Sequence, residues 1–141
     1  VHEKLMRYNF ARLDYQHLLV LVPGNFQAQL GLALLNEKDQ HLTEAYDGIN
    51  SLIEQYPDSA VAYAARGGME KERGMLDLAV YDYGEAMRLD STCQDYVVNH
   101  ADLLISLGRK SEAYDDLRRL QKMGVKSGQL QDFFARLRRK K

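Results

Sequence analysis

The stretch from Ala79 to Asp90, which reads AVYDYGEAMRLD, decides the fold. Its residues Ala79, Tyr83 and Ala86 are spaced by four and then three positions, the spacing of one face of an amphipathic α-helix. Alanine recurs at the position of Ala79 in a register of 34 residues. The alanines of this register are Ala11, Ala45, Ala79 and Ala113. A period of this length indicates a repeated supersecondary unit, so the chain is predicted to be a repeat protein.

A second register of small residues lies upstream in each unit. It contains Ala33, Gly67 and Ala101, again 34 residues apart. Small side chains at two fixed phases let a pair of helices cross closely, so each unit is predicted to be a helix hairpin. The expected helices are residues 2–21, 26–38, 42–55, 59–73, 76–89, 93–107, 110–123 and 128–139. Loops of two to four residues make neighbouring helices antiparallel, and no sustained strand alternation occurs.

Residues at the helix ends agree with these boundaries. The candidate N-caps, whose side-chain oxygens can accept a bond from the first turn, are Asn25, Asp58 or Ser59, Ser91 or Thr92, and Ser127. The candidate left-handed residues that close a helix are Gly74, Gly108 and Gly124. The fold class is therefore predicted to be all-α, with about eight helices.

Composition narrows the class of protein further. The chain has 141 residues, 45% of them hydrophobic and only two of them proline, which excludes a disordered or collagen-like chain. The sequence has no run of about 18 apolar residues, so we expect no membrane-spanning segment. The cellular compartment stays open because the chain starts at Val1; a cytoplasmic location is slightly favoured, with periplasmic and secreted locations as alternatives. A larger parent protein, with further repeats before Val1, is hypothesised.

These features resemble the tetratricopeptide repeat (TPR), a 34-residue helix hairpin. The unit with Tyr63, Gly67, Gly74, Ala79 and Tyr83 is most similar to the family pattern. The resemblance divides a single domain, residues 1–141, into a partial repeat at 1–25, full repeats at 26–59, 60–93 and 94–127, and a C-terminal capping helix at 128–141. The implied fold is a right-handed solenoid of stacked hairpins, whose concave face is lined by the first helix of each unit.

The resemblance implies a non-enzymatic scaffold or adaptor that binds a peptide or a partner-protein segment in the concave groove. The predicted binding residues are the positions of the first helices that packing does not use. They are Gln27, Leu30, Leu34, Lys38, Val61, Ala64, Ala65, Gly68, Lys71, Glu72, Asp95, Asn99 and Asp102. The lining passes from small and apolar to acidic and amide-bearing residues, and exposed apolar patches of this kind mark binding surfaces. Packing within the solenoid is the alternative explanation for Leu30 and Leu34.

Catalytic and metal-binding chemistry is not predicted. His41 and Glu44 are one turn apart, but two ligands without a third rarely hold zinc. Cys93 has no base next to it in sequence and is interpreted as a small packing residue. Arg66 and His100 share one register position and are expected to be half-buried packing residues with polar tips at the surface. We expect no cofactor, metal or small-molecule substrate.

Two further surfaces provide alternatives. Residues 1–108 carry eight Lys and Arg against sixteen Asp and Glu, whereas residues 109–141 carry eleven against four. The basic end, residues 136–141, could attract nucleic acid, but it lacks aromatic platforms, so a solvating cap is preferred. An accessory domain of a larger protein or enzyme is another alternative. Self-association through residues 1–22 would cover an apolar stripe of the first helix, which contains Leu5, Tyr8, Ala11, Tyr15, Leu18 and Val22.

Overall fold

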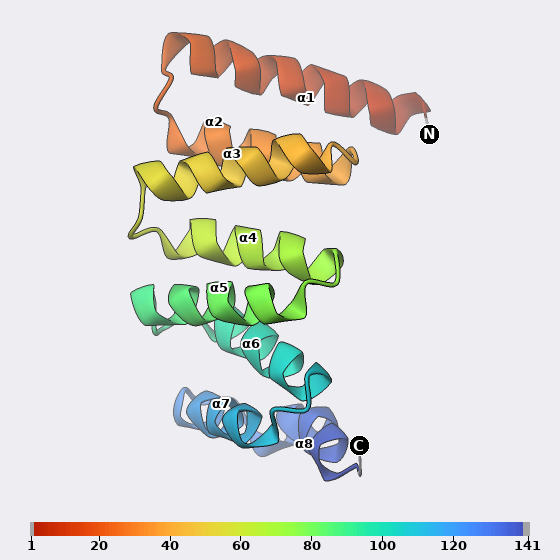
Figure 1. Cartoon of the computed structure of the whole chain (residues 1–141), viewed down its shortest axis with the longest axis vertical. Helices are drawn as coiled ribbons and strands as arrows, with labels where there is room; N and C mark the ends of the chain where they lie inside the picture. Colours follow the sequence, from red (N-terminus) through yellow and green to blue (C-terminus); the bar gives the residue numbers. More distant parts are fainter. Residues whose placement is uncertain (1, 140–141) are drawn as a thin grey trace. The chain divides into compact units, whose positions relative to one another are not determined.

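A computed structural model describes residues 2–139, excluding the side chain of His2, and all of its regular elements are helical (Figure 1). The α-helices are α1 (His2–Leu21), α2 (Phe26–Lys38), α3 (Leu42–Gln55), α4 (Ala60–Glu72), α5 (Leu76–Leu89), α6 (Gln94–Ser106), α7 (Lys110–Lys122) and α8 (Gln131–Arg138). A 3-10 turn, η1 (Ser127–Leu130), precedes α8. The predicted all-α class is confirmed, and each helix boundary lies within a few residues of the sequence-based expectation.

The helix ends show which predicted caps are used. The Asn25 carboxamide accepts a hydrogen bond from the Ala28 amide at 2.7 Å, and the Ser59 hydroxyl accepts one from the Ala62 amide at 3.2 Å. The predicted cap of α6 is wrong, since Cys93 holds that position with no side-chain bond and the Thr92 amide donates to Asp90 instead.

The glycine predictions for the ends of α4, α6 and α7 are confirmed. Gly74, Gly108 and Gly124 all have positive φ, between 75° and 101°. Ser127 is not the predicted cap of an α-helix, because it begins the 3-10 turn and the N-cap of that turn is Lys126.

The chain forms two compact units, residues 1–66 and residues 67–141, and the division falls within α4. In the first unit α2 packs against α3 and against α1. The Arg12 guanidinium on α1 donates to the Asp39 carboxylate at 2.8 Å and to the Asn36 carboxamide at 3.1 Å, at the C-terminal end of α2. Because all three side chains are largely buried, this contact fixes α1 to α2.

In the second unit, α6 packs against both α5 and α7, and α8 also contacts α6. The register alanines Ala79 and Ala113 and the upstream Ala101 are completely buried, as the repeat predicts. A Cβ placed on Gly67 would lie 2.9 Å from the ring of the buried Tyr83, so the close helix crossing expected there is confirmed. In the first unit Ala33 and Ala45 are buried too.

His100 is half-buried, as expected, and its ring has a partner inside the second unit. Nδ1 lies 2.5 Å from the carboxylate of Asp116, whose side chain is buried. A buried polar group is costly unless it is hydrogen-bonded, so the polar tip is directed to a partner between α6 and α7. Arg66 is half-buried and donates to the Asn50 carboxamide at 3.0 Å within the first unit.

Candidate functional site

One helix face carries small side chains that are not fully covered. On α4, Val61, Ala64, Ala65, Gly68 and Glu72 follow one another at intervals of three, one, three and four residues, which places them along one face. Val61 is 47% exposed, and the two alanines and Gly68 are half-buried. Ala62 and Met69, which lie off this face, are buried. The α4 face, residues 61, 64, 65, 68 and 72, therefore presents backbone and short apolar side chains at four positions and ends at the exposed Glu72.

The predicted residues of α2 divide into two groups. Gln27 and Lys38 are exposed and Leu34 is half-buried, so each presents some surface. Leu30 has only 9% of its surface exposed. Its prediction as a lining residue is wrong, because α2 is packed by both α1 and α3 and Leu30 belongs to the resulting core.

The acidic residues of the second unit make an internal ion cluster. The Asp102 carboxylate on α6 accepts from Arg136 of α8 at 2.6 Å and lies 3.1 Å from the Lys71 ammonium of α4. Lys71 also donates to the Asn99 carboxamide at 3.3 Å, and the Asn99 amide donates to the Asp95 backbone carbonyl at 2.9 Å. These residues lie together in the second unit, and most of their polar groups bind one another.

Electrostatics confirm that Asp102 is held as a carboxylate. Burial favours its neutral form, but the hydrogen bonds and positive charges of Arg136 and Lys71 outweigh burial and hold the pKa of Asp102 below its ordinary value. Its negative charge is therefore neutralised within the unit. Asp95 is exposed and remains the acidic side chain of this set with the most access to solvent.

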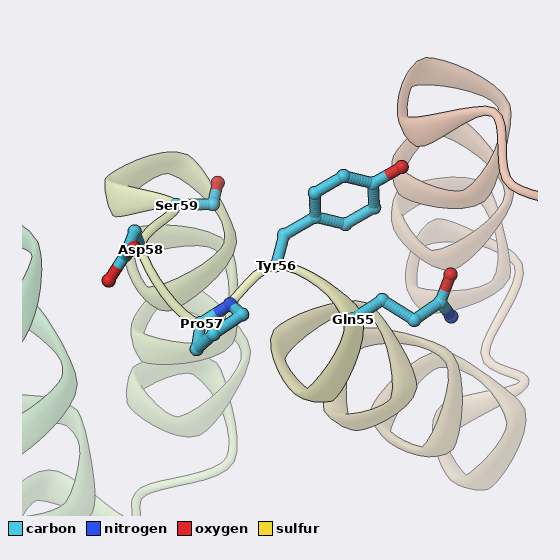
Figure 2. A pocket seen from close by; sticks show the side chains of 5 residues that line it. All are labelled: Gln55, Tyr56, Pro57, Asp58 and Ser59. Atoms are coloured by element: carbon cyan, nitrogen blue, oxygen red, sulfur yellow. The ribbon is translucent and has the colours of Figure 1, made fainter.

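A shallow hollow of about 390 Å³ lies at the turn between α3 and α4 (Figure 2). Its lining is Gln55, Tyr56, Pro57, Asp58 and Ser59. The Tyr56 hydroxyl donates a hydrogen bond to the Gly24 carbonyl at 2.7 Å, and Ser59 caps α4. The side-chain amides of Gln55 and Gln29 donate hydrogen bonds to each other. Because these polar groups already serve the turn, the hollow offers few of them to a ligand.

The titratable side chains of the described residues were candidates for a metal site. Within residues 2–139, no three His, Cys, Asp or Glu side chains converge closely enough to hold a metal ion. His41 Nε2 lies 3.8 Å from the Asp39 carboxylate, and Cys93 is half-buried. None of the described helices is long and apolar enough to cross a membrane.

Part of the basic end, residues 136–141, makes contacts within the second unit. Arg136 is engaged with Asp102, and the Lys110 ammonium donates to the Arg139 carbonyl at 2.7 Å. Arg138 and Arg139 are exposed, while Lys140 and Lys141 lie outside the described residues. Fewer cations are thus free for nucleic acid than the sequence suggests.

Sequence reasoning missed the most exposed apolar surface. Of the stripe expected on α1, Tyr8, Ala11 and Tyr15 are half-buried, and Tyr15 packs closely against Gly31 of α2. The opposite side of α1 carries a second stripe, which we call the outer face. It consists of Met6, Phe10, Leu13, Val20 and Leu21, exposed by 55%, 62%, 60%, 77% and 75%. Reading both helical faces of residues 2–21, rather than the repeat phases alone, would have revealed it.

Solved structures establish the fold. The chain superposes on MamA RS-1, in its ArsTM double mutant, with a TM-score of 0.73 and 18% identity, covering 84% of this chain and 67% of that one. The TPR domain of Arabidopsis OM64 gives a TM-score of 0.68 and 18% identity, covering 80% and 93%. The chain has the TPR fold. No protein-family profile matches it.

A third similar structure contains a bound peptide. It is the type III secretion chaperone SycD of Yersinia enterocolitica in complex with a peptide of the translocator YopD. The TM-score is 0.64 with 17% identity, covering 79% of this chain and 85% of the chaperone.

One curated enzyme also aligns with the sequence. The asparagine–tRNA ligase of Buchnera aphidicola subsp. Acyrthosiphon pisum (strain APS) is 27% identical over 129 residues. The alignment covers 87% of this chain but only 28% of the ligase, so the chain spans less than a third of that protein.

Proposed function

We propose that this TPR domain is a non-enzymatic scaffold or adaptor that binds an extended or helical segment of another protein. The α4 face carries the proposal. It leaves Val61 exposed and the adjacent alanines and Gly68 partly open, on a helix of the class that lines the concave face in TPR proteins. A segment lying along this face between Val61 and Gly68 can approach the helix backbone closely, because the side chains there are short.

The rigidity of the hairpins supports this function. A surface built on packed helices is formed before the ligand arrives, so less conformational entropy is lost on binding than on a mobile loop. Leu34 and Gln27 of α2 are proposed as further contacts within the first unit, and Asp95 and Asn99 of α6 as contacts within the second. The peptide-bound chaperone among the similar structures supports a peptide or protein as the ligand class.

The test selects ligands directly. A library of displayed random peptides is panned against the full chain, and the affinity of each selected peptide is measured by fluorescence polarisation. Val61→Glu and Leu34→Glu should each weaken binding at least tenfold, which corresponds to about 1.4 kcal/mol. Leu78→Glu is the matched control, since Leu78 is an equally exposed apolar residue on α5.

Circular dichroism must show unchanged helicity for each variant. Failure to select any peptide, or selected peptides that bind Val61→Glu and Leu34→Glu as tightly as the natural chain, would remove the proposed function.

A further inference from the structure

The outer face of α1 is more apolar than the equivalent surfaces of the other units. Moving each residue by multiples of 34 positions gives its equivalents in the second helices of those units. Phe10 becomes Glu44, Leu78 or Glu112, and Leu13 becomes Asp47, Tyr81 or Asp115. In α3 and α7 both equivalents are exposed acidic residues, so packing there does not require apolar residues. In α5 the two equivalents are apolar and exposed, whereas α1 has five apolar residues that are more than half exposed.

Within the first unit, α1 packs on α2 through its other side (Figure 1). Tyr8, Ala11, Arg12, Tyr15 and Leu19 are the half-buried residues of α1 and mark that inner side. The outer face is turned away from them, because residues such as Met6, Phe10 and Leu13 lie about half a helical turn from this group. No other described element of the first unit covers the outer face.

Four residues of the outer face, together with His17, have the spacing of a helix-pairing seam. The seam residues Met6, Phe10, Leu13, His17 and Val20 follow at intervals of four, three, four and three residues. This is the a and d spacing of a heptad, in which knobs of one helix enter holes of the next. The seam covers two heptads and contains one polar residue, His17, which is exposed.

The flanking charges select the orientation of a partner helix. Arg7 and Asp14 are exposed on the same edge of the seam, seven residues apart, and neither makes an ion pair with any described residue. The other edge carries Asn9 and Gln16, which are uncharged. In an antiparallel pair of identical helices, the edge with Arg7 and Asp14 meets the same edge of the other copy. In a parallel pair, it meets the edge with Asn9 and Gln16. Only the antiparallel pair gives Arg7 and Asp14 charged partners.

From this geometry we propose that two copies of the chain associate through the outer faces of α1, arranged antiparallel about a two-fold axis between Phe10 and Leu13. Phe10 of one copy then packs on Leu13 of the other. Arg7 lies about 3 Å along the axis from Asp14 of the other copy, two residues at 1.5 Å rise. The symmetry forms this ion pair twice, and a two-fold contact closes without leaving a second surface to propagate.

The area predicts a weak dimer. In this register Met6, Phe10 and Leu13 lie against the seam of the other copy, whereas Val20 faces Glu3. The apolar area in contact is therefore on the order of 350 Å² per copy, against about 800 Å² per partner in a standard interface. A dissociation constant in the micromolar range is expected. Sedimentation equilibrium of the full chain from about 1 to 100 μM should therefore show a reversible monomer–dimer equilibrium.

Three substitutions test the contact. Leu13→Glu should weaken the dimer at least tenfold. Tyr81→Glu is its matched control, since Tyr81 occupies the same register position on α5 and is 61% exposed. Arg7→Asp alone should weaken the dimer about threefold to tenfold, and adding Asp14→Arg should restore the natural constant within about twofold, since the pairs reform with reversed sign.

Orientation is tested by cross-linking. In the antiparallel pair the two Met6 residues are about 16 Å apart along the axis, too far for a disulfide. Met6→Cys in a Cys93→Ser background should therefore remain uncross-linked under oxidation, whereas a parallel pair would form the bridge. Such a bridge would overturn the proposed arrangement.

The remaining outcomes are also decisive. A concentration-independent monomer would overturn the dimer, as would an association that Tyr81→Glu disrupts and Leu13→Glu does not. Binding of the monomer to anionic lipid vesicles, lost in Leu13→Glu, with no dimer in solution, would assign the outer face to a membrane surface instead. None of these results depends on whether a peptide binds the α4 face.

Discussion

Two adjacent glycines of α4 should respond to alanine with opposite signs. In a helix interior, glycine is about 1 kcal/mol less favourable than alanine, because it loses more backbone freedom on folding. Gly67 and Gly68 therefore give up similar amounts of helix stability. They differ in what an added methyl group would meet.

At Gly67 the added Cβ would lie 2.9 Å from two ring carbons of Tyr83. Tyr83 is buried, so its ring cannot move aside into solvent. Overpacking a core contact costs about 1 to 3 kcal/mol, which exceeds the gain in helix propensity. Gly67→Ala should thus lower the free energy of unfolding by about 1 kcal/mol.

At Gly68 the nearest atom to the added Cβ is the Tyr83 hydroxyl oxygen at 3.4 Å, the far end of that side chain. Only a slight adjustment is needed there, so the helix propensity dominates. Gly68→Ala should raise the free energy of unfolding by about 0.5 to 1 kcal/mol. The two variants then differ by about 2 kcal/mol.

Urea denaturation followed by circular dichroism measures this difference. The midpoint should fall for Gly67→Ala and rise for Gly68→Ala, with the slope unchanged in both, since each alters native packing and not the area exposed on unfolding. Equal midpoints for the two variants, or a stabilised Gly67→Ala, would refute the assignment of Gly67 as the close-crossing position.

Three other predictions concern stability. Asp102→Asn should lower the free energy of unfolding by about 1 kcal/mol at neutral pH, by removing the ion pairs with Arg136 and Lys71. The folded-state pKa of Asp102 is lowered, so its stabilisation is present above the unfolded-state pKa and is lost as the pH falls through the folded-state value. Denaturation curves of the two proteins should therefore begin to converge below about pH 4. Asn25→Ala should cost about 1 kcal/mol, by loss of the α2 cap, with a lower thermal midpoint as the readout. Ala79→Leu should cost about 1 to 3 kcal/mol by overpacking a completely buried position, and a neutral result in the same denaturation assay would mean that the register is misassigned.

The helical architecture could be predicted from the sequence because it depends on local, periodic properties. Small residues at Ala45, Ala79 and Ala113 recur at 34 positions, and each is buried in the structure. Gly74 and Gly108 mark turns through a backbone conformation that favours glycine, whatever their neighbours are. Such signals are contained in a few consecutive residues.

The candidate site could be predicted only in part. The exposed and half-buried residues of the α4 face follow from helical spacing, but Leu30 belongs to the core because α1 and α3 both pack on α2. The cluster of Asp102, Lys71 and Arg136 joins residues up to 65 positions apart in the chain. Asp102 and Arg136 are one repeat period apart, but the period does not by itself show that two side chains of unlike type face each other.

The amino-acid sequence by itself determined the helices, most of their ends and the positions where small residues let helices cross closely. Each of these depends on spacing along one or two elements. Tertiary structure decided which sides of those helices meet. It placed Tyr15 against α2 and left Phe10 and Leu13 on the open side of the same helix, although all three are large and apolar. Burying an apolar side chain lowers the free energy of the folded state, but the neighbouring helix decides which side of a helix can be buried.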